Sequence, residues 1–533
     1  MTNRRIQLLL AAVTVAALAP FLNKAFDIDD PLFLWMAQQI KHHPFDPYGA
    51  IVQWSSVPQP LWISMQNPPL SSYYMAAVGA LFSFREIPMH LAFLLPAVAT
   101  VFGTFALAQR LCRRPATAAC LTLFSPVFLV SATHVMCDVL LLAFWVWAIH
   151  CWIAGLERNE RRSFAFAALL ISGATLTKYF GISLVPLLLL YTLVRERRAR
   201  AELVWLALPV VVAIAFELLT KVKYGHALFS SAMLYLRDVA VEVRIPPQTK
   251  LMTGLSFIGG CMIGALFFAS ARNAKAIGVA VISFLLAAAL FWICVPLAAD
   301  VGSPLGLRLQ GSLFATVGLC ILALALWDFW KSRTADSLLL LLWVFGTFLF
   351  ATFLNWSITA RTVLPMTPAV SILVLRWWER AEEARAPTSF PIWRITALAI
   401  LSLLIASADS WRADASRSAA REFRKQFGPM KTRVWFQSHW GFQFYMQKGK
   451  AKPLAATSYV RPGDLIAIPS DNADPFPLPR PAVTVAEISR PTLPLLTTFA
   501  PGTGAGFYSS VRGPVPWVIA RTAPERFEML KFP

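Results

Sequence analysis

Charged residues are scarce in this chain. Only 14% of its 533 residues are Asp, Glu, Lys or Arg, whereas 57% are hydrophobic, and the mean hydropathy is +0.58. An ordinary soluble domain carries about 25% charged residues, so this composition excludes one. It predicts a protein embedded in a membrane.

Paired cysteine motifs are also absent. All seven cysteines lie in or beside apolar segments, and none has the spacing of a metal-ligand pair. We interpret them as small hydrophobic core residues. No cysteine follows residue 409, so the C-terminal part must fold without disulfides. The sequence shows neither an internal repeat nor a low-complexity stretch.

Acidic residues are too few to balance the basic ones, and the net charge is +20. Such an excess suggests nucleic-acid binding, but the positions of the basic residues indicate otherwise. Twenty of the 48 Lys and Arg residues cluster in short loops at alternate ends of the apolar segments. Basic loops of this kind remain in the cytoplasm. We therefore expect a lipid bilayer as a partner, and no nucleic acid.

Apolar segments of membrane length recur as far as residue 408. Placing the basic loops inside predicts thirteen spans, at residues 6–23, 89–109, 115–133, 137–155, 163–177, 180–194, 202–220, 251–270, 276–297, 310–330, 337–355, 362–377 and 392–408. The N-terminus is then cytoplasmic, and the C-terminal part is periplasmic or extracellular. We expect a multi-pass protein of the cell (inner) membrane. The apolar stretch 70–84 is short and follows two prolines, so it should lie in the interface or re-enter.

Three segments on the outer side are long enough to fold. Residues 24–88 form a first loop rich in Pro, Trp and Tyr, and residues 221–250 form a second, polar loop. Residues 410–533 form a tail of mixed character. Alternation of apolar residues in it predicts strands at 433–437, 465–469 and 482–488, and a helix at 440–448. The expected fold class is an all-α polytopic membrane domain, residues 1–409, followed by a soluble extracytoplasmic α/β domain, residues 410–533.

Two adjacent carboxylates, Asp29 and Asp30, stand just beyond the first predicted span, in FDIDDPLFLW. Like charges side by side are costly near hydrocarbon unless a proton, a cation or a metal engages them. Helix capping is the alternative, because Pro31 suits a first helical position, but capping needs only one carboxylate. The pair is therefore the first candidate for chemistry. If a divalent metal ion is needed, these two residues are its expected ligands.

Three more charged residues lie at the outer ends of spans: Asp138, Lys178 and Arg361. With the acidic pair they would line one cavity in which carboxylates face cations. Cations can bind a phosphate and stabilise it as it leaves, and a carboxylate can take a proton from an attacking hydroxyl. Capping by Asp138 and snorkelling by Lys178 stay open as alternatives. Possible additional site residues are Lys221, Lys223, Arg237 and His134.

Five segments in this order resemble the GT-C superfamily of membrane glycosyltransferases, in particular its protein O-mannosyltransferase and aminoarabinose transferase branch (glycosyltransferase family 39). They read DDPLFLWMAQQI, QNPPLSSYYMA, SATHVMCDVLLL, GATLTKYFGISLVPLLLLY and ARTVLPMTPAV. The resemblance implies a GT-C fold of about 13 transmembrane helices. It implies transfer of a sugar from a polyprenyl-phosphate donor to a hydroxyl or phosphate of a protein, lipid or glycan, on the outer face.

The resemblance also assigns roles to the candidate residues. Asp29 or Asp30 would engage the acceptor or a metal ion, and Asp138 would be a second essential carboxylate. Lys178 and Arg361 would contact the lipid phosphate. The chain departs from the family pattern at the first motif, which has Asp-Asp-Pro in place of Asp-Glu and a small residue. Of the two neighbours, we favour Asp29 as the acting carboxylate.

Two rival functions use the same charges without chemistry. One is a transporter or flippase of lipid-linked sugars, and the other is a non-catalytic membrane scaffold whose tail binds a partner. Transporters usually show repeated halves and paired broken helices near the midplane, and this sequence shows neither. The sequence therefore favours an enzyme over both.

Overall fold

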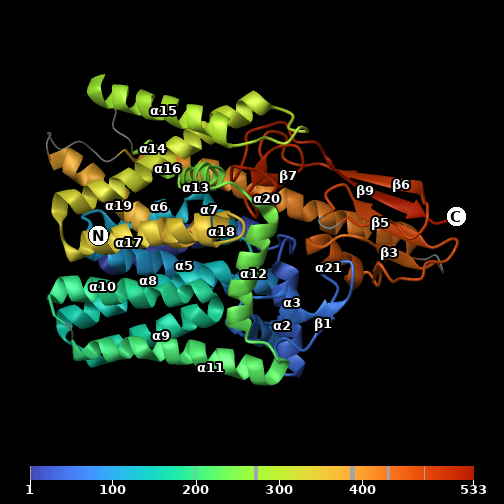
Figure 1. The fold of residues 1–533 in the computed structure, drawn as a ribbon, viewed down its shortest axis with the longest axis horizontal. Coiled ribbons are helices and arrows are strands. Elements are labelled where there is room, and N and C mark those ends of the chain that lie inside the picture. Colours follow the sequence, from blue (N-terminus) through green and yellow to red (C-terminus); the bar gives the residue numbers. More distant parts are fainter. Residues whose placement is uncertain (1, 199, 269–273, 384–390, 429–431, 473–474) are drawn as a thin grey trace.

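The computed structural model describes residues 2–198, 200–268, 274–383, 391–428, 432–472 and 475–533. Figure 1 shows long helices packed side by side over most of the molecule and a small sheet at the end nearest the C-terminus. The expected fold class, a helical membrane part followed by a C-terminal α/β region, is confirmed.

The helices of the membrane part include several that are short or interrupted. Those up to residue 200 are α1 (Asn3–Leu18), α2 (Asp30–His42), α3 (Leu61–Ser64), α4 (Leu70–Phe82), α5 (Glu86–Leu111), α6 (Pro115–Leu123), α7 (Pro126–Ser131), α8 (Cys137–Arg158), α9 (Arg161–Thr177) and α10 (Leu184–Glu196). Those that follow are α11 (Ala207–Tyr224), α12 (Leu228–Val243), α13 (Pro247–Cys261), α14 (Gly264–Phe267), α15 (Ala274–Cys294), α16 (Pro304–Ser332), α17 (Ala335–Leu349), α18 (Ala360–Val363), α19 (Thr367–Glu383) and α20 (Ile392–Phe427). Short 3-10 or π segments extend some of them: η1 (Ala19–Phe21), η2 (Tyr179–Ser183), η3 (Ala201–Leu206), η4 (Phe350–Leu354) and η5 (Leu364–Met366).

Each predicted span overlaps helical segments, although residues 269 and 270 of the span 251–270 lie outside the described residues. Among the described residues, eight helical stretches are long and apolar enough to cross a membrane: Asn3–Phe21, Glu86–Leu111, Cys137–Arg158, Tyr179–Glu196, Ala201–Tyr224, Pro304–Ser332, Ala335–Leu354 and Ile392–Phe427. Several of the others are shorter or are broken. For example, the predicted span 115–133 divides between α6 and α7, where Pro126 follows the N-cap Ser125. The number thirteen stays a prediction.

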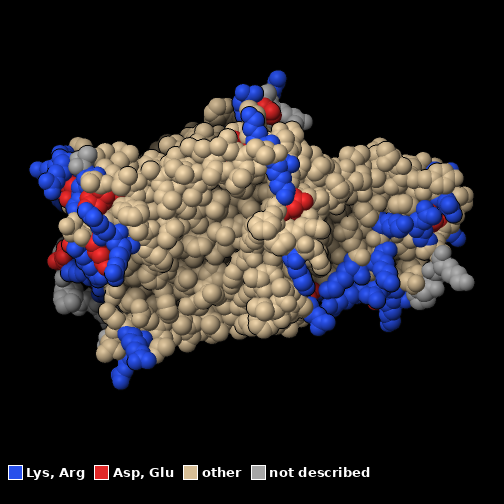
Figure 2. All heavy atoms as spheres, turned by 90° about the horizontal axis from the view of Figure 1, so that it is seen from below, with Lys and Arg blue, Asp and Glu red and all other residues tan. Residues whose placement is uncertain are grey.

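The distribution of charge on the surface fits a membrane belt. Figure 2 shows charged side chains at one end of the bundle and again toward the tail, with a band of uncharged side chains between them. At the far end, basic and acidic residues of the loops pair with one another, as Arg114 does with Glu382 at 2.7 Å. Apolar side chains in the belt, such as Ile214 and Leu218 of α11, are exposed, as lipid-facing residues are in the protein alone. The chain is a multi-pass membrane protein.

The two predicted outer loops are largely helical. Residues 24–88 contain α2, α3 and α4 together with the antiparallel pair β1 (Ile51–Val52) and β2 (Gln59–Pro60). The interpretation of residues 221–250 as a polar loop is wrong. The segment holds α12, which runs across the direction of the neighbouring helices (Figure 1) and buries Leu228 and Ala232. Most residues of α12 are apolar, and the helix buries some of them while others, such as Met233 and Leu234, stay exposed.

The tail carries a five-stranded sheet in the order β4-β3-β5-β9-β6. The strands are β3 (Val434–Phe436), β4 (Lys452–Pro453), β5 (Leu465–Pro469), β6 (Val483–Arg490) and β9 (Glu525–Lys531), and a separate small pair consists of β7 (Phe499–Ala500) and β8 (Ala505–Gly506). Strand β3 is parallel to β4 and β5, and β9 runs antiparallel between β5 and β6. Helix α21 (Trp440–Lys448) has the predicted bounds.

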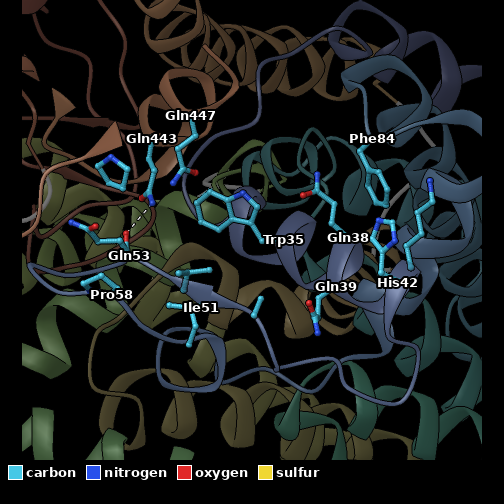
Figure 3. A pocket seen from close by; sticks show the side chains of 14 residues that line it. Trp35, Gln38, Gln39, His42, Ile51, Gln53, Pro58, Phe84, Gln443 and Gln447 are labelled. Atoms are coloured by element: carbon cyan, nitrogen blue, oxygen red, sulfur yellow. Dashed lines mark hydrogen bonds between the residues drawn. The ribbon is translucent and has the colours of Figure 1, made fainter. Parts of the chain in front are cut away.

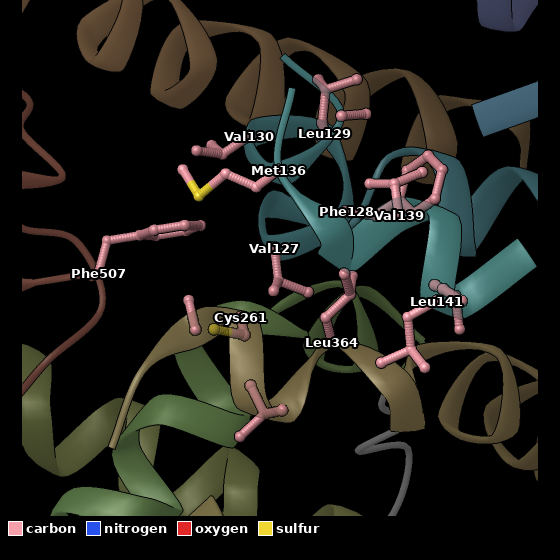
Figure 4. Close-up of a cluster of buried hydrophobic side chains, with 14 of the residues drawn as sticks. Val127, Phe128, Leu129, Val130, Met136, Val139, Leu141, Cys261, Leu364 and Phe507 are labelled. Atoms are coloured by element: carbon pink, nitrogen blue, oxygen red, sulfur yellow. The ribbon is translucent and has the colours of Figure 1, made fainter. Parts of the chain in front are cut away.

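Membrane part and tail share one helix and one core. Helix α20 continues without a break through the domain boundary predicted at residues 409 and 410. The buried apolar cluster of the bundle also reaches into the tail. Figure 4 shows Phe507 of the tail facing Met136, beside Val127 and Cys261 of the bundle. This shared core holds the outer ends of the helices against the tail.

Candidate active site

A cavity of about 790 Å³ lies where the helix ends nearest the tail meet it, and we call it the outer cavity because these ends are predicted to face outward. Four of the predicted site residues line it: Asp29, Asp138, Lys178 and Arg361. Its other walls are mostly apolar and come from α3, η2, α12 and η4. Residues from seven or more separate segments of the sequence thus line this one space.

The four charged side chains form a chain of alternating sign. The Arg361 guanidinium lies 2.7 Å from a carboxylate oxygen of Asp29 and 3.8 Å from one of Asp138. Lys178 donates to the other oxygen of Asp138 at 2.7 Å. Arg361 Nε and Asp138 Oδ2 are buried without a hydrogen-bond partner among the described residues. Buried polar atoms normally have partners, so these two mark a place where a ligand would complete the set.

Local backbone structure aims Asp29 into the cavity. Asp29 is the N-cap of α2, with Pro31 just inside the helix, but its side chain makes no capping bond. The carboxylate is used by Arg361 instead, so capping does not account for it. Ile28, the residue before it, has a φ of 51°, which is rare for a β-branched residue. Strained positions of this kind gather at functional sites.

Arg361 and the two other cavity residues are held by helix ends. Thr359 and Thr362 form a reciprocal capping box that begins α18 and fixes the turn carrying Arg361. Asp138 lies in the first turn of α8, where the helix dipole favours a negative charge. Lys178 ends α9, directly before the 3-10 segment η2.

Asp30 lies outside the outer cavity, beneath it. Its oxygens accept hydrogen bonds from the backbone N–H groups of Asp27 and Val135, each at 3.0 Å, and face His134 Nδ1 at 3.0 Å. Burial alone would raise the pKa of Asp30, but the charge and hydrogen bond of His134 outweigh it, and the pKa lies below its ordinary value. The neighbouring carboxylates therefore have different surroundings.

His134 belongs to a buried polar network that joins three parts of the chain. Lys24, beyond the first span, lies 2.5 Å from Asp409 of α20 and donates to Thr133 at 2.9 Å. The Tyr508 hydroxyl, from the tail, donates to Asp409 at 2.8 Å and lies 2.6 Å from His134 Nε2. The sequence indicated His134 as a candidate but gave no prediction for Lys24, Asp409 or Tyr508. A charged residue within the apolar stretch before the tail was the only signal for Asp409.

The tail also forms part of the cavity wall. The N–H of Ala360 donates to the carbonyl of Phe507 at 2.8 Å, and the N–H of Ser510 donates to the carbonyl of Ile358 at 2.8 Å. Tyr508 lines the cavity, and its ring faces the Arg361 guanidinium at 5.9 Å. The segment that presents Arg361 is thus paired with the tail on both sides.

The additional candidates of the second outer segment lie elsewhere. Lys221 is exposed, and Lys223 pairs with Asp46 at 3.5 Å. Arg237 is exposed and lies 3.3 Å from Asp238. None of the three lines the outer cavity, although Phe229 and Met233 of the same region do.

The structure gives no cluster of metal ligands. Within the described part of the chain, no group of three or more His, Cys, Asp or Glu side chains is placed to hold a metal ion. Asp29 and Asp30 point to different surroundings, so they do not form a two-carboxylate site. Asp29 and Asp138, which share Arg361, are the pair that faces the cavity.

Comparison with known proteins gives one family match. Residues 66–219 match the model of a family described as dolichyl-phosphate-mannose-protein mannosyltransferase. The match confirms the resemblance to protein mannosyltransferases over this segment. It starts at the Gln66-Asn67-Pro68 motif and includes Asp138 and Lys178, whereas Asp29 and Arg361 lie outside it. No curated protein matches the chain.

Three solved structures that the chain resembles are remote in sequence. The oligosaccharyltransferase of Archaeoglobus fulgidus, tethered with an acceptor peptide, is 14% identical, with a TM-score of 0.49 over 85% of this chain and 64% of that one. ArnT from Cupriavidus metallidurans, bound to undecaprenyl phosphate, is 13% identical, with a TM-score of 0.43 over 88% of this chain and 94% of that one. The mycobacterial arabinofuranosyltransferase AftD is 13% identical, with a TM-score of 0.37 over 99% and 40%. This chain thus spans less than two thirds of the length of the archaeal enzyme.

Proposed function

We propose that the chain is a membrane glycosyltransferase that moves a sugar from a polyprenyl-phosphate donor to an acceptor hydroxyl on the outer face of the membrane. The observation that carries the proposal is the convergence of Asp29, Asp138, Lys178 and Arg361 on the outer cavity. The family match supports it, because that family's description names a lipid-phosphate sugar as the donor.

The cavity offers both parts that such a donor needs. Lys178 and Arg361 supply cations for the phosphate, and the apolar wall supplies a surface for the first part of the lipid. Phe229, Met233 and Leu354 line that wall, and Met233 and Leu354 are also exposed. We propose that the polyprenyl chain leaves the cavity between α12 and η4.

The reaction we propose is a single displacement at the anomeric carbon. Asp29 takes the proton of the acceptor hydroxyl as its oxygen forms the new bond to that carbon. The bond from the carbon to the phosphate oxygen breaks, and its electron pair stays with the phosphate. Lys178 and Arg361 stabilise the charge that develops there. Displacement from the opposite side inverts the anomeric configuration.

Donor binding would also free Asp29 to act as the base. In the protein alone, Arg361 is engaged by Asp29 at 2.7 Å. A phosphate offers the guanidinium a stronger, bidentate partner. As Arg361 turns to the phosphate, Asp29 loses its cation and becomes free to accept a proton. Asp138 stays between Lys178 and Arg361 and keeps both cations in place.

The test is sugar transfer in proteoliposomes that contain the purified full-length protein and a radiolabelled polyprenyl-phosphate sugar. Wild type should release free polyprenyl phosphate and label the acceptor, and Asp29→Asn should not. Movement of the donor across the bilayer with no transfer would favour the flippase. Transfer that is unchanged in both Asp29→Asn and Asp138→Asn would overturn the proposal.

A further inference from the structure

A second cavity, of about 660 Å³, lies on the outer side between α2, the β1–β2 hairpin and α21 of the tail. Five glutamines line it: Gln38, Gln39, Gln53, Gln443 and Gln447. We call it the amide pocket. In Figure 3 the Trp35 indole lies between the amides of Gln443 and Gln447 and that of Gln38. Nothing in the proposed reaction uses this space.

The glutamines have side-chain donors and acceptors without partners in the described part of the chain, although the Gln53 amide already donates to the carbonyl of Leu454. Gln443 is fully buried, and its amide donates to the carbonyl of Gln53 at 2.8 Å, but its Oε1 has no partner among the described residues. A buried amide oxygen without a partner is costly. The side chains of Gln38, Gln39 and Gln447 make no hydrogen bond at all to the described residues. Each amide can both donate and accept.

The lining selects the chemistry of a ligand. Among the described residues, no acidic side chain lines the amide pocket, so it does not suit a cation. The basic side chains described there are Lys41 and His42, both in the last turn of α2, so the remainder does not suit an extended anion. Five amides do not suit a hydrocarbon chain. A neutral molecule with many hydroxyls fits, because each hydroxyl pairs with an amide while the indole of Trp35 covers an apolar C–H face.

The pocket is also connected to the candidate active site. Asp29 is the N-cap of helix α2, and Gln38 lies roughly 13 Å further along the axis, at nine residues and the standard rise of about 1.5 Å per residue. Trp54 lines the outer cavity and packs edge-on against Trp35 of the amide pocket, with ring centroids 6.1 Å apart. The tryptophan pair thus marks the boundary between the two spaces. A short oligosaccharide covers this distance.

We infer that the amide pocket is a subsite for a neutral glycan, and that the acceptor of this enzyme is an oligosaccharide whose terminal hydroxyl reaches Asp29. The inference rests on the proposed function for the acceptor role, and on the pocket alone for glycan binding. It narrows the acceptor from a protein, lipid or glycan to a glycan. It also gives a role to the contact between the first outer segment and the tail, since both supply walls.

The experiment measures binding separately from transfer. Purified full-length protein in nanodiscs is titrated calorimetrically with maltoheptaose, cellopentaose, linear mannopentaose and a linear arabinan pentasaccharide, and with oligogalacturonate as the charged comparison. The variant Gln38→Ala/Gln447→Ala removes one amide from each wall. Both side chains are half-buried and unbonded, so folding should be unaffected. Gln426→Ala, an exposed glutamine on α20 outside both cavities, is the matched control.

Binding of at least one neutral oligosaccharide, weakened about tenfold or more in the double variant and unchanged in Gln426→Ala, supports the inference. The inference is overturned if no neutral probe binds, if oligogalacturonate alone binds, or if the double variant binds like wild type. Asp29→Asn should bind the glycan normally. If glycan binding follows the pattern but no sugar is transferred by wild type, the proposed function fails and the subsite stands. If transfer occurs and the double variant leaves the acceptor KM unchanged, the subsite fails and the proposed function stands.

Discussion

Arg361 donates a hydrogen bond to the carboxylate of Asp29 at 2.7 Å, although 332 residues separate them in the sequence. The contact joins the first outer segment to the start of α18, and it holds a base candidate against a phosphate-binding candidate. An ion pair of this kind keeps both groups in place until a ligand competes for one of them. Its two members can be tested separately.

The first prediction concerns Asp29→Asn. The amide keeps the shape of the side chain but cannot accept a proton, so transfer should fall by about 10²–10⁴-fold. Binding of the donor lipid phosphate should be retained, because Arg361 no longer has a competing carboxylate. Transfer is measured with labelled donor, and donor binding with the same lipid in nanodiscs. Loss of both together would show that Asp29 acts in binding or folding and is not the base.

Arg361→Lys tests whether binding of the phosphate needs the two parallel hydrogen bonds of a guanidinium or only a positive charge. Lysine preserves the positive charge but cannot form two parallel hydrogen bonds to a phosphate. We expect donor affinity to fall by about tenfold or more. Lys178→Arg, which keeps a charge at the neighbouring position, is the comparison. Donor affinity that is equal in Arg361→Lys and wild type would mean that Arg361 is held by Asp29 alone and does not reach the phosphate.

Much of the membrane part is readable from the sequence because hydropathy acts locally. The run 202–220 is almost entirely apolar, and it lies within one continuous helical stretch, Ala201–Tyr224. The interrupted spans are harder, since α6 and α7 together are as apolar as one span and differ only by the turn at Ser125 and Pro126. Helix α12 was missed because charged residues such as Arg237 and Asp238 indicate a loop, although most residues of Leu228–Val243 are apolar.

The candidate site could be predicted only in part, because hydropathy reports on the local sequence and not on which segments meet in the fold. Charges at the outer ends of spans, such as Asp138 and Lys178, stand out against apolar surroundings. The different surroundings of Asp29 and Asp30 could not be predicted from the sequence, because they depend on a turn at Ile28 and on partners more than a hundred residues away. Tyr508 and the glutamines of the amide pocket carry no local signal. They matter only because the tail folds back on the first outer segment.

Asp30 should matter for stability. Replacing it with alanine leaves the N–H of Val135 and the ring of His134 without their acceptor, and breaking a buried pair of this type costs about 3–5 kcal/mol. Asp30→Ala should therefore unfold at a clearly lower temperature than Asp29→Ala, measured by tryptophan fluorescence in detergent. Equal unfolding temperatures for the two variants would contradict this assignment of roles.

The pH dependence of the same contribution follows from the pKa. The pKa of Asp30 in the folded protein lies below the ordinary value of 3.8, because the charge and hydrogen bond of His134 outweigh burial. A lowered pKa means that the ionised group stabilises the fold above pH 3.8, and that this contribution is lost as the pH falls through the folded-state pKa. The gap in unfolding temperature between wild type and Asp30→Asn should be constant near neutral pH and shrink on acidification. A gap that widened at acid pH would be inconsistent with an ionised Asp30.

Tyr508→Phe tests the link between tail and bundle. The substitution removes only the hydroxyl that donates to Asp409 and lies beside His134, while the ring next to Arg361 is kept. We expect a loss of about 1–3 kcal/mol in stability, since Asp409 loses a donor in a buried site. Transfer should fall less than in Asp29→Asn. The matched control is Tyr459→Phe, an exposed tyrosine of the tail, which should change neither property.

The last prediction concerns orientation, on which the whole site depends. The basic loops after α8 and α10 lie at the end of the bundle away from the tail, and the outer cavity lies at the opposite end, beside the tail. By the rule that basic loops stay in the cytoplasm, the cavity faces the periplasm or the exterior. In a bacterial host, alkaline phosphatase fused after Pro533 should be active, because the enzyme folds only outside the cytoplasm. A fusion in the loop at Arg197 should be inactive, and green fluorescent protein at the two positions should give the reverse pattern. Activity at Arg197 and none at Pro533 would place the cavity in the cytoplasm, where a lipid-linked donor on the outer leaflet could not reach Asp29 or Arg361.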